Sequence, residues 1–511
     1  MKSSIPDQLA ARQRQIDNRL DKTDLGDCSK PVLSASNIQY EISERVHAIP
    51  YGGIGAFHLL ARRLGLIELI DYRLHLLKIH LPYHESDHVL NIAFNPLCNG
   101  ACLQDIELRR NDVNFLDALG ARRIPDPTTA SDFCRRFRED DINVLQDIYD
   151  EVRVGVWKRQ PDSFFAQAIL DADGTLVATG AEHKEGIDIA YDGTWGYHAL
   201  LVSLANTGEV MRIVNRPGNR PSHEGAAAAL DRAAATCFRA GFRQVLLRGD
   251  TDFSQTAHLD RWNQDSRIRF IFGYDAKDNL EDQARQLPEI AWKTLNRRQP
   301  AQPATAPRQK RPNVKDERVR ARAFETLRLQ SEQVAEFNYR PVACRNEYRM
   351  VVVRKNISRE KGEECLFDEI RYFFYITNEW AEDPETIVLG PRGANGRCNQ
   401  ENLIQQLQGG VHAFKAPVDT LLSNWAYMVM TSLAWNLKAW SALVLPETGP
   451  EPERNHAEKS WLLRIEFKTF VNALVAIPCQ IVRQARCVIY RVLAYNPYQP
   501  IFFRLLDALR C

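Results

Sequence analysis

The chain has 511 residues, enough for about three or four domains at roughly 150 residues each. Hydrophobic residues make up 44% and charged residues 26%, the balance of a folded globular protein, which excludes wholesale disorder and collagen-like repeats. The 66 basic and 65 acidic residues leave a formal net charge of +1. Any nucleic-acid site must therefore come from local clusters of basic side chains and not from the charge of the whole molecule.

The 11 cysteines are scattered, and they form neither a CxxC pair nor a Cys/His cluster with zinc-finger spacing. A reduced, intracellular protein is the simplest interpretation of this pattern. The N-terminus lacks the apolar segment of a signal peptide. The most apolar late stretches, 425–435 and 470–482, are shorter than the ~20 residues that cross a bilayer. These features predict a cytoplasmic protein.

The first third of the sequence predicts helices. Residues 1–30 are polar and are expected to form a poorly ordered tail. From about 50 to 155, apolar residues recur at spacings of three and four, as in FHLLARRLGLIELIDYRLHLL. Pro127, followed by two threonines and an amphipathic run, predicts the start of a helix. Residues 31–158 are therefore expected to form an all-helical domain.

Strand patterns begin near residue 160. Three strands are predicted in succession, in AQAILDADGTLVATG, GYHALLVSLA and GEVMRIVNRPG. An alanine-rich helix ending at Gly241 follows, and two further strands are predicted in QVLLRGDTDF and IRFIFGYDA, with a helix between them. Three adjacent strands followed by alternating helices and strands predict a mixed α/β sheet over residues 159–280.

The next segment combines a basic linker with further strands. Residues 296–330 carry 10 Lys/Arg against 3 Asp/Glu and are rich in proline, which predicts an exposed basic linker. The sequences YRMVVVRKN and RYFFYITN are β-rich. Residues 281–392 are therefore expected to form a β-rich insertion.

The last part of the sequence predicts helices again. Residues 393–446 have helical patterning, and the Trp/Met/Leu-rich stretch 425–440 is expected to be a core helix packed behind the sheet. Residues 447–511 are expected to form a basic helical region, because 454–511 carry 9 Lys/Arg against 3 Asp/Glu.

Acidic residues stand at the ends of two predicted strands. Asp171 and Asp173 lie in LDADGT, and Asp250 and Asp252 lie in RGDTDF. Carboxylates at the ends of neighbouring strands converge on one edge of a sheet, where they repel one another unless protons or cations neutralise them. Hard divalent cations such as Mg²⁺ suit such oxygen ligands. The alternative, that each aspartate only caps a turn, stays open for any one of them.

Several segments carry a resemblance to a known family. They are YHESDHVLNIAFNPLCNGACLQDIELRRND, IPDPTTASDFCRRF, LDADGT, VLLRGDTDF, YFFYITN, QENLIQQLQGG and SNWAYMVMTSLAWNL. In their order and spacing they resemble the group-one DDE transposases of bacterial insertion sequences, the insertion sequence 1380-like group. The resemblance implies an RNase H-like catalytic domain, built from residues 159–280 and 393–446 and interrupted by the β-rich insertion, with the helical domain 31–158 binding DNA.

The resemblance also implies which acids do the chemistry. The family's first Asp falls on Asp173, with Asp171 as the fallback, and its second falls on Asp250. Asp252 stands where the family usually has glycine. The third acid falls on Glu401, on a predicted helix 401–408. A basic residue usually follows that glutamate in the family, whereas Gln405, Gln406 and Gln408 occupy those turns here.

A two-metal mechanism follows from this resemblance. Asp173, Asp250 and Glu401 would hold two Mg²⁺ ions, with Mn²⁺ as a possible substitute. The implied activity is cleavage of double-stranded DNA at transposon terminal inverted repeats and joining of the 3′-hydroxyl ends to target DNA. The implied state is a homodimer on DNA, associated with the nucleoid when bound, and no membrane partner is expected.

Basic side chains near the acidic clusters are candidates for DNA contacts. We expect this role for Arg212, Arg216, Arg220, Arg397, Lys415, Arg135 and Arg136, the last two being in RRFR (135–138), interpreted as a basic helix face. A solvated surface is the alternative for any one of them. Trp195, Tyr197 and His198 are more simply explained as strand packing than as contacts to a distorted base.

Two other functions stay open at this point. A transposase that has lost catalysis but still recognises inverted repeats would explain Asp252 and the glutamines after Glu401. A nuclease of the same fold without strand transfer would use the same acidic residues.

Overall fold

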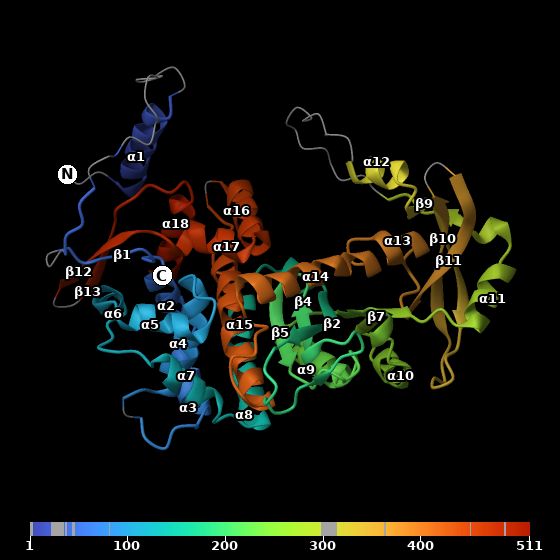
Figure 1. Cartoon of the computed structure of the whole chain (residues 1–511), viewed down its shortest axis with the longest axis horizontal. Coiled ribbons are helices and arrows are strands. Elements are labelled where there is room, and N and C mark those ends of the chain that lie inside the picture. The colour runs from blue at the N-terminus through green and yellow to red at the C-terminus, as the bar shows by residue number, and fades with distance from the viewer. Residues whose placement is uncertain are drawn as a thin grey trace.

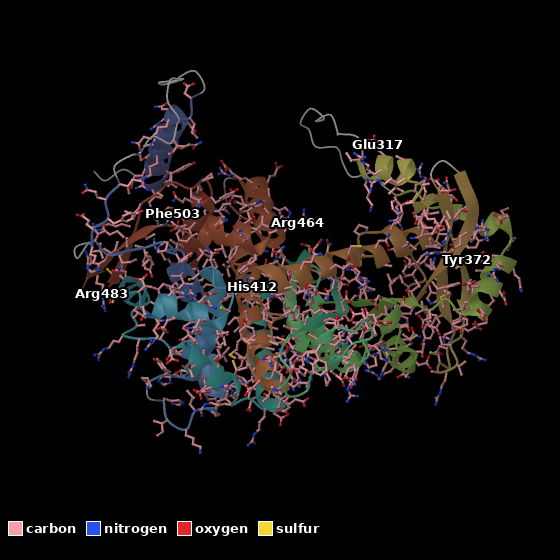
Figure 2. The ribbon with its side chains drawn as sticks, viewed as in Figure 1. Glu317, Tyr372, His412, Arg464, Arg483 and Phe503 are labelled. Carbon is pink, nitrogen blue, oxygen red and sulfur yellow. The ribbon has the colours of Figure 1, made fainter. Side chains whose placement is uncertain are left out.

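Figure 1 shows the computed structural model of the chain, in which helices gather at one end and long strands at the other. The structure describes residues 4–21, 35, 38–42, 46–80, 82–297, 314–361, 364–449, 451–484 and 487–510. Arg464, Arg483 and Phe503 lie in the helical part, and Tyr372 lies at the opposite end (Figure 2). Among the helices described, none combines the length and apolar character needed to cross a membrane.

The N-terminal helices lie where the apolar spacing predicts them. They are α2 (Ile54–Arg63), α3 (Leu66–Arg73), α4 (Glu85–Leu97), α5 (Ile106–Arg110), α6 (Val113–Leu119), α7 (Pro127–Cys134) and α8 (Glu139–Trp157). The predicted start at Pro127 is confirmed, because the Asp126 side chain accepts the backbone N–H of Thr129 and Pro127 occupies the first helical position.

Both ends of the chain differ from expectation. The polar tail contains helix α1 (Ile5–Arg19), started by a capping box at Ser4 and burying no residue, whereas residues 22–30 lie outside the described part. The C-terminal region is not wholly helical. Helices α16 (Pro452–Arg464), α17 (Phe467–Phe470) and α18 (Gln499–Arg510) enclose strands β12 (Cys479–Gln484) and β13 (Cys487–Val492).

Strand β12 pairs with the short strand β1 (Ala48–Ile49), so the N-terminal domain is not all-helical either. This pairing, together with packing of α18 on α2, joins the two ends of the chain in one helical body. The prediction failed because β12 and β13 are only six residues long and mix apolar with basic residues, which hides their alternation.

The mixed sheet begins with the strands predicted after residue 160. They are β2 (Ala168–Ala178), β3 (Asp188–Ile189), β4 (Trp195–Leu204), β5 (Glu209–Val214), β6 (Val245–Gly249) and β7 (Ile268–Tyr274). Strand β4 lies antiparallel to β2 and β5, whereas β2, β6 and β7 run parallel. Helices α9 (Ala226–Ala240) and α10 (Thr256–Gln264) connect β5 to β6 and β6 to β7.

The β-rich insertion extends this sheet and is not a separate body. It contains the long strands β9 (Glu325–Tyr339), β10 (Tyr348–Lys361) and β11 (Glu364–Thr377), and β11 pairs antiparallel with β7. With β8 (Lys293–Thr294), the sheet reaches ten strands. Helices α11 (Asp278–Gln286), α12 (Val314–Ala321) and α13 (Pro384–Leu389) flank it. Residues 298–313 of the basic linker lie outside the described part.

Helix α15 (Leu421–Leu443) joins the sheet to the helical body (Figure 1). The prediction of a core helix is confirmed, because nearly all its side chains are buried and it contacts β5 as well as α4 and α8. Its polar atoms bond to the sheet: Asn436 Oδ1 accepts the N–H of Val210 at 2.9 Å, and Trp440 Nε1 donates to Glu209 at 2.8 Å. Helix α14 (Cys398–Gln405), which continues as a π-helical turn, lies against β2.

Candidate active site

Two of the predicted acids lie together at one edge of the sheet. Strands β2 and β6 are parallel and in register at Leu170 and Leu247, so they approach the same edge. Asp173 lies on β2 beyond the stretch that pairs with β6, and Asp250 follows the last residue of β6. Both line a cavity of about 410 Å³. Its other residues are Gly174, Thr175, Leu176, Tyr191, His198, Ser222, Asp252 and Gln408.

A guanidinium group bridges this acidic pair. Arg397 Nη1 lies 2.9 Å from Asp173 Oδ2, and Arg397 Nη2 lies 3.9 Å from Asp250 Oδ2. Burial raises the pKa of Asp173 to about 6 and also raises the pKa of Asp250, although Arg397 opposes both shifts. Because both carboxylates are partly buried and carry the same charge, a neighbouring cation favours their ionised forms. Arg397 is that cation here.

The turn after β6 fixes the position of Asp250. Its Oδ1 accepts the backbone N–H of Asp252 at 3.0 Å and so caps the short 3₁₀ turn Thr251–Phe253. Gly273 on β7 leaves room for that turn, because a Cβ atom there would lie 2.6 Å from the Thr251 nitrogen. Asp252 is exposed, lines the same cavity and raises the pKa of Asp250 through its negative charge, after the larger effect of burial.

Glu401 does not line the cavity that Asp173 and Asp250 share. It is exposed on α14, one helical turn after Arg397. Further along the same segment, Gln408 donates to Thr175 Oγ1 at 2.9 Å. In sequence, Glu401 lies between Arg397 and Gln408, whose side chains both contact residues of β2. Within the described ranges, no three His, Cys, Asp or Glu side chains are close enough together to hold one metal ion. The structure thus brings Asp173 and Asp250 together around Arg397, whereas Glu401 lies on α14, one helical turn after Arg397.

Asp171, the fallback for the first acid, belongs to the core. Its side chain is 1% exposed and pairs with Arg248 of β6 through two contacts of 2.7 and 2.8 Å. Arg248 also donates to the Gly393 carbonyl at 2.9 Å, which ties the segment before Arg397 to the sheet. Asp171 is therefore a structural residue, and this correction leaves Asp173 as the only acid of β2 in the cavity.

Two of the expected DNA-binding arginines are buried. Arg212 is 4% exposed and pairs with Asp150 and Asp147 of α8. Arg216 donates to the His198 carbonyl at 2.9 Å and to three carbonyls of the loop before α9, and burial lowers its pKa to about 10. Both are buried and bonded to acceptors within the protein, so in this conformation they do not present their guanidinium groups to DNA.

The remaining basic candidates differ in their exposure and in whether they pair with acidic residues. Arg220 is half exposed and lies 3.8 Å from Glu224, and Lys415 is exposed. Arg135 pairs with Asp132 and Asp419, whereas Arg136 is exposed. RRFR does not form a helix face, because α7 ends at Cys134 and α8 begins at Glu139. Arg220, Arg136 and Lys415 stay candidates for phosphate contacts.

The aromatic residues of β4 have packing roles, as expected. Trp195 donates to the Ala181 carbonyl, Tyr197 donates to the Glu185 carbonyl, and His198 is buried with Nδ1 2.8 Å from the Arg220 carbonyl. Sequence reasoning missed the salt bridge from Arg397 to the acids and the contact of Gln408 with Thr175. For the salt bridges of Arg397, the available sequence signal was that Arg397 precedes Glu401 by four residues, which is about one helical turn.

Comparison with known proteins identifies the family. The sequence profile described as transposase DDE domain group 1 matches residues 49–511. Eight solved chains match, among them a piggyBac transposase in a synaptic complex with hairpin DNA, at 11% identity and a TM-score of 0.36, covering 86% of this chain and 82% of that chain. No curated protein sequence matches significantly. Because the profile match spans most of its length, the chain belongs to the transposase DDE domain group 1 family.

Proposed function

We propose that this protein is a metal-dependent DNA transposase that binds the terminal inverted repeats of its element, cuts the DNA there and joins the 3′-hydroxyl ends to target DNA. Family membership supports the class of reaction. The observation that carries the assignment in this chain is the pairing of Asp173 and Asp250 around one cation at the sheet edge. The strand order, three antiparallel strands followed by two parallel ones, supports an RNase H-like catalytic domain.

The acidic pair fits a divalent cation. Its donors are carboxylate oxygens, the ligands that Mg²⁺ and Mn²⁺ prefer. The raised pKa values of Asp173 and Asp250 show that burial disfavours their charge, which a cation would stabilise. We propose that Asp173 and Asp250 hold the metal ions and that Glu401, from the next turn of α14, completes the ligand set.

Bound cations would supply Lewis-acid charge to the scissile phosphodiester and help to activate the attacking hydroxyl group. The protein's own groups would hold the DNA in place. A bound cation would compete with Arg397 for these carboxylate oxygens, so we expect its guanidinium to turn to a DNA phosphate. Arg220 and Lys415 would neutralise phosphates further along the strand, and two protomers would bind the two ends of the element as a homodimer.

A substitution at Asp173 tests the proposed metal site through stability. The pKa of Asp173 is raised to about 6, so its contribution to stability is present below about pH 4 and is lost as the pH rises through about 6. In EDTA, the wild type should therefore lose melting temperature relative to Asp173→Asn as the pH rises over that range. Above pH 6, Mg²⁺ should raise the melting temperature of the wild type and leave that of Asp173→Asn nearly unchanged. Equal shifts of both proteins with Mg²⁺ would contradict the assignment.

The function itself is tested with DNA carrying the inverted repeats that flank the gene. Purified protein is incubated with this DNA and a target plasmid, in Mg²⁺ or in EDTA. Cleavage at the repeat ends with joining to the plasmid, only in Mg²⁺, is the expected result. Cleavage without joining would indicate a nuclease. Binding without cleavage would indicate a DNA-binding protein that has lost catalysis, the alternative that Asp252, Gln405 and Gln408 motivate.

A further inference from the structure

One ring nitrogen of His198 is not used by the packing of β4. The side chain is 4% exposed and lines the cavity that contains Asp173 and Asp250. Its Nδ1 lies 2.8 Å from the carbonyl oxygen of Arg220, which can only accept a hydrogen bond, so Nδ1 carries the ring proton and donates it. Nε2 therefore keeps its lone pair, and in the part of the chain that the structure describes no group forms a hydrogen bond with it.

The surroundings of His198 favour this neutral form of the ring. Burial has the largest effect on the pKa of His198 and lowers it from its ordinary value, although the hydrogen bond to the Arg220 carbonyl opposes this shift. A neutral imidazole that donates from one nitrogen accepts at the other. Nε2 is therefore a hydrogen-bond acceptor.

Arg216 fixes the loop that selects this tautomer. The backbone N–H of His198 donates to the Arg216 carbonyl at 2.8 Å, and Arg216 Nε donates back to the His198 carbonyl at 2.9 Å. The same guanidinium donates to three carbonyls within residues 221–224. These bonds hold the loop, and with it the Arg220 carbonyl, against the ring. The burial of Arg216 thus serves the orientation of His198.

Nε2 lies beside the strand that carries Asp173. His198 is paired with Leu176 across β4 and β2, and a Cβ atom on Gly174 would lie 2.6 Å from Nε2. The absence of a side chain at Gly174 therefore leaves room for the ring. Gly174 directly follows Asp173 and lines the same cavity. An acceptor without a partner thus stands next to the acidic pair, at the place where the proposed function puts the DNA.

We propose that His198 Nε2 accepts a hydrogen bond from the attacking water or 3′-hydroxyl group and so directs the oxygen of that group toward the scissile phosphorus. The proposal rests on the proposed function, in which Asp173 and Asp250 are committed to cations. A nucleophile that is held by its O–H group points its lone pair elsewhere, and such orientation accelerates a reaction strongly. No proton has to move to the ring for this role. His198 would then be a catalytic residue beside the three acids.

Two substitutions separate the two ring nitrogens. An Asn amide reaches the position of Nδ1 and can donate to the Arg220 carbonyl, whereas a Gln amide reaches the position of Nε2. We expect His198→Asn to melt near the wild type, to bind repeat-end DNA with unchanged affinity and to cut it about 10²-fold more slowly in a single turnover. His198→Gln should melt below His198→Asn and yet cut faster, an order that a purely structural role would not produce.

His258→Asn is the matched control. The Nδ1 atom of His258 also has a polar neighbour, Arg261 Nη2 at 3.5 Å, but the residue lies on α10 outside the cavity. This variant should cut at the wild-type rate. Equal slowing of His258→Asn and His198→Asn would overturn the proposal, because the loss would then be a general effect of replacing a histidine.

Repeat-end DNA with sulfur in place of the 3′-bridging oxygen at the cleavage site distinguishes the nucleophile from the leaving group. Sulfur leaves without help, so a residue that assists the leaving oxygen loses its importance on this DNA, whereas a residue that orients the nucleophile keeps it. We expect His198→Asn to stay about 10²-fold slower than the wild type on this DNA. Equal rates on it would overturn the proposed role.

The outcomes also separate this proposal from the proposed function. If the wild type cuts repeat-end DNA and His198→Asn cuts it equally fast, the role of His198 is refuted and the proposed function stands. The same holds if the two His198 variants lose activity only in the order in which they lose melting temperature. If the wild type neither binds nor cuts this DNA, the proposed function is refuted, and the role of His198 with it.

Discussion

Asp250→Asn is expected to bind repeat-end DNA and to cut it at least about 10²–10³-fold more slowly than the wild type, the loss that follows when one group that stabilises a transition state is removed. The substitution removes a negative charge and a metal-ligating oxygen. It keeps an amide oxygen that can accept the N–H of Asp252, now 3.0 Å from Asp250 Oδ1. The turn after β6 should therefore keep its shape, and the loss should fall on the chemical step.

Single-turnover cleavage and a DNA-binding titration, measured on the same samples, check this prediction. Asp265→Asn is the matched control, because Asp265 also accepts an N–H two residues on, from Arg267 at 3.0 Å, but precedes β7 at the opposite edge of the sheet. The control should cut at the wild-type rate. Wild-type cleavage by Asp250→Asn would remove Asp250 from the site, and equal loss in both variants would indicate a general effect of the substitution.

Arg248→Leu is expected to lower the free energy of unfolding by about 3–5 kcal/mol, the cost of leaving a buried charge unpaired. Arg248 and Asp171 are 2% and 1% exposed, so the substitution leaves the Asp171 carboxylate buried without its guanidinium partner. The variant should also cut DNA more slowly, because Arg248 holds the Gly393 carbonyl at 2.9 Å and so supports the segment that leads to Arg397.

Denaturant unfolding followed by fluorescence measures the first effect. An exposed ion pair, Arg285 with Glu281 at 2.7 Å on α11, is the comparison: Arg285→Leu should change stability by no more than about 1 kcal/mol. Replacing both Arg248 and Asp171 by apolar residues should recover much of the loss, since no charge is then left unpaired. A loss below about 1 kcal/mol for Arg248→Leu alone would contradict the structural role given to this pair.

Local sequence patterns predicted the part of the site that depends on strand ends. Asp250 follows the apolar strand β6, as predicted, whereas Asp173 lies within β2, which continues to Ala178 and does not end at LDADGT as expected. The two acids still come together because β2 and β6 run parallel and side by side. Local sequence patterns alone did not distinguish Asp171 from Asp173, and the choice of Asp173 rested on the family resemblance. It depends on the register of β2 against β6, which sets Asp171 opposite Arg248 and leaves Asp173 beyond the paired stretch.

The basic residues show the opposite case. The sequence predicted that Arg212 and Arg216 lie at the surface and contact DNA. Both are buried, because Arg212 pairs with Asp150 of α8 and Arg216 bonds to the loop before α9. The short strand β12 likewise pairs with β1, more than 400 residues away in the chain, and β13 pairs with β12. Such long-range pairings can override local propensity. A prediction from local patterns therefore missed these strands and made the C-terminal region helical throughout.

We propose above that the pair formed by Asp173 and Asp250 is a metal site in which Arg397 takes the place of the cation. Crystals of the protein bound to repeat-end DNA, soaked in Mn²⁺ and measured at the manganese absorption edge, test it most directly. We expect an anomalous peak within ligand distance of both carboxylates, with Glu401 turned toward it and Arg397 moved onto the DNA backbone. DNA seated at the sheet edge with no manganese there, and Arg397 still bridging the two aspartates, would contradict it.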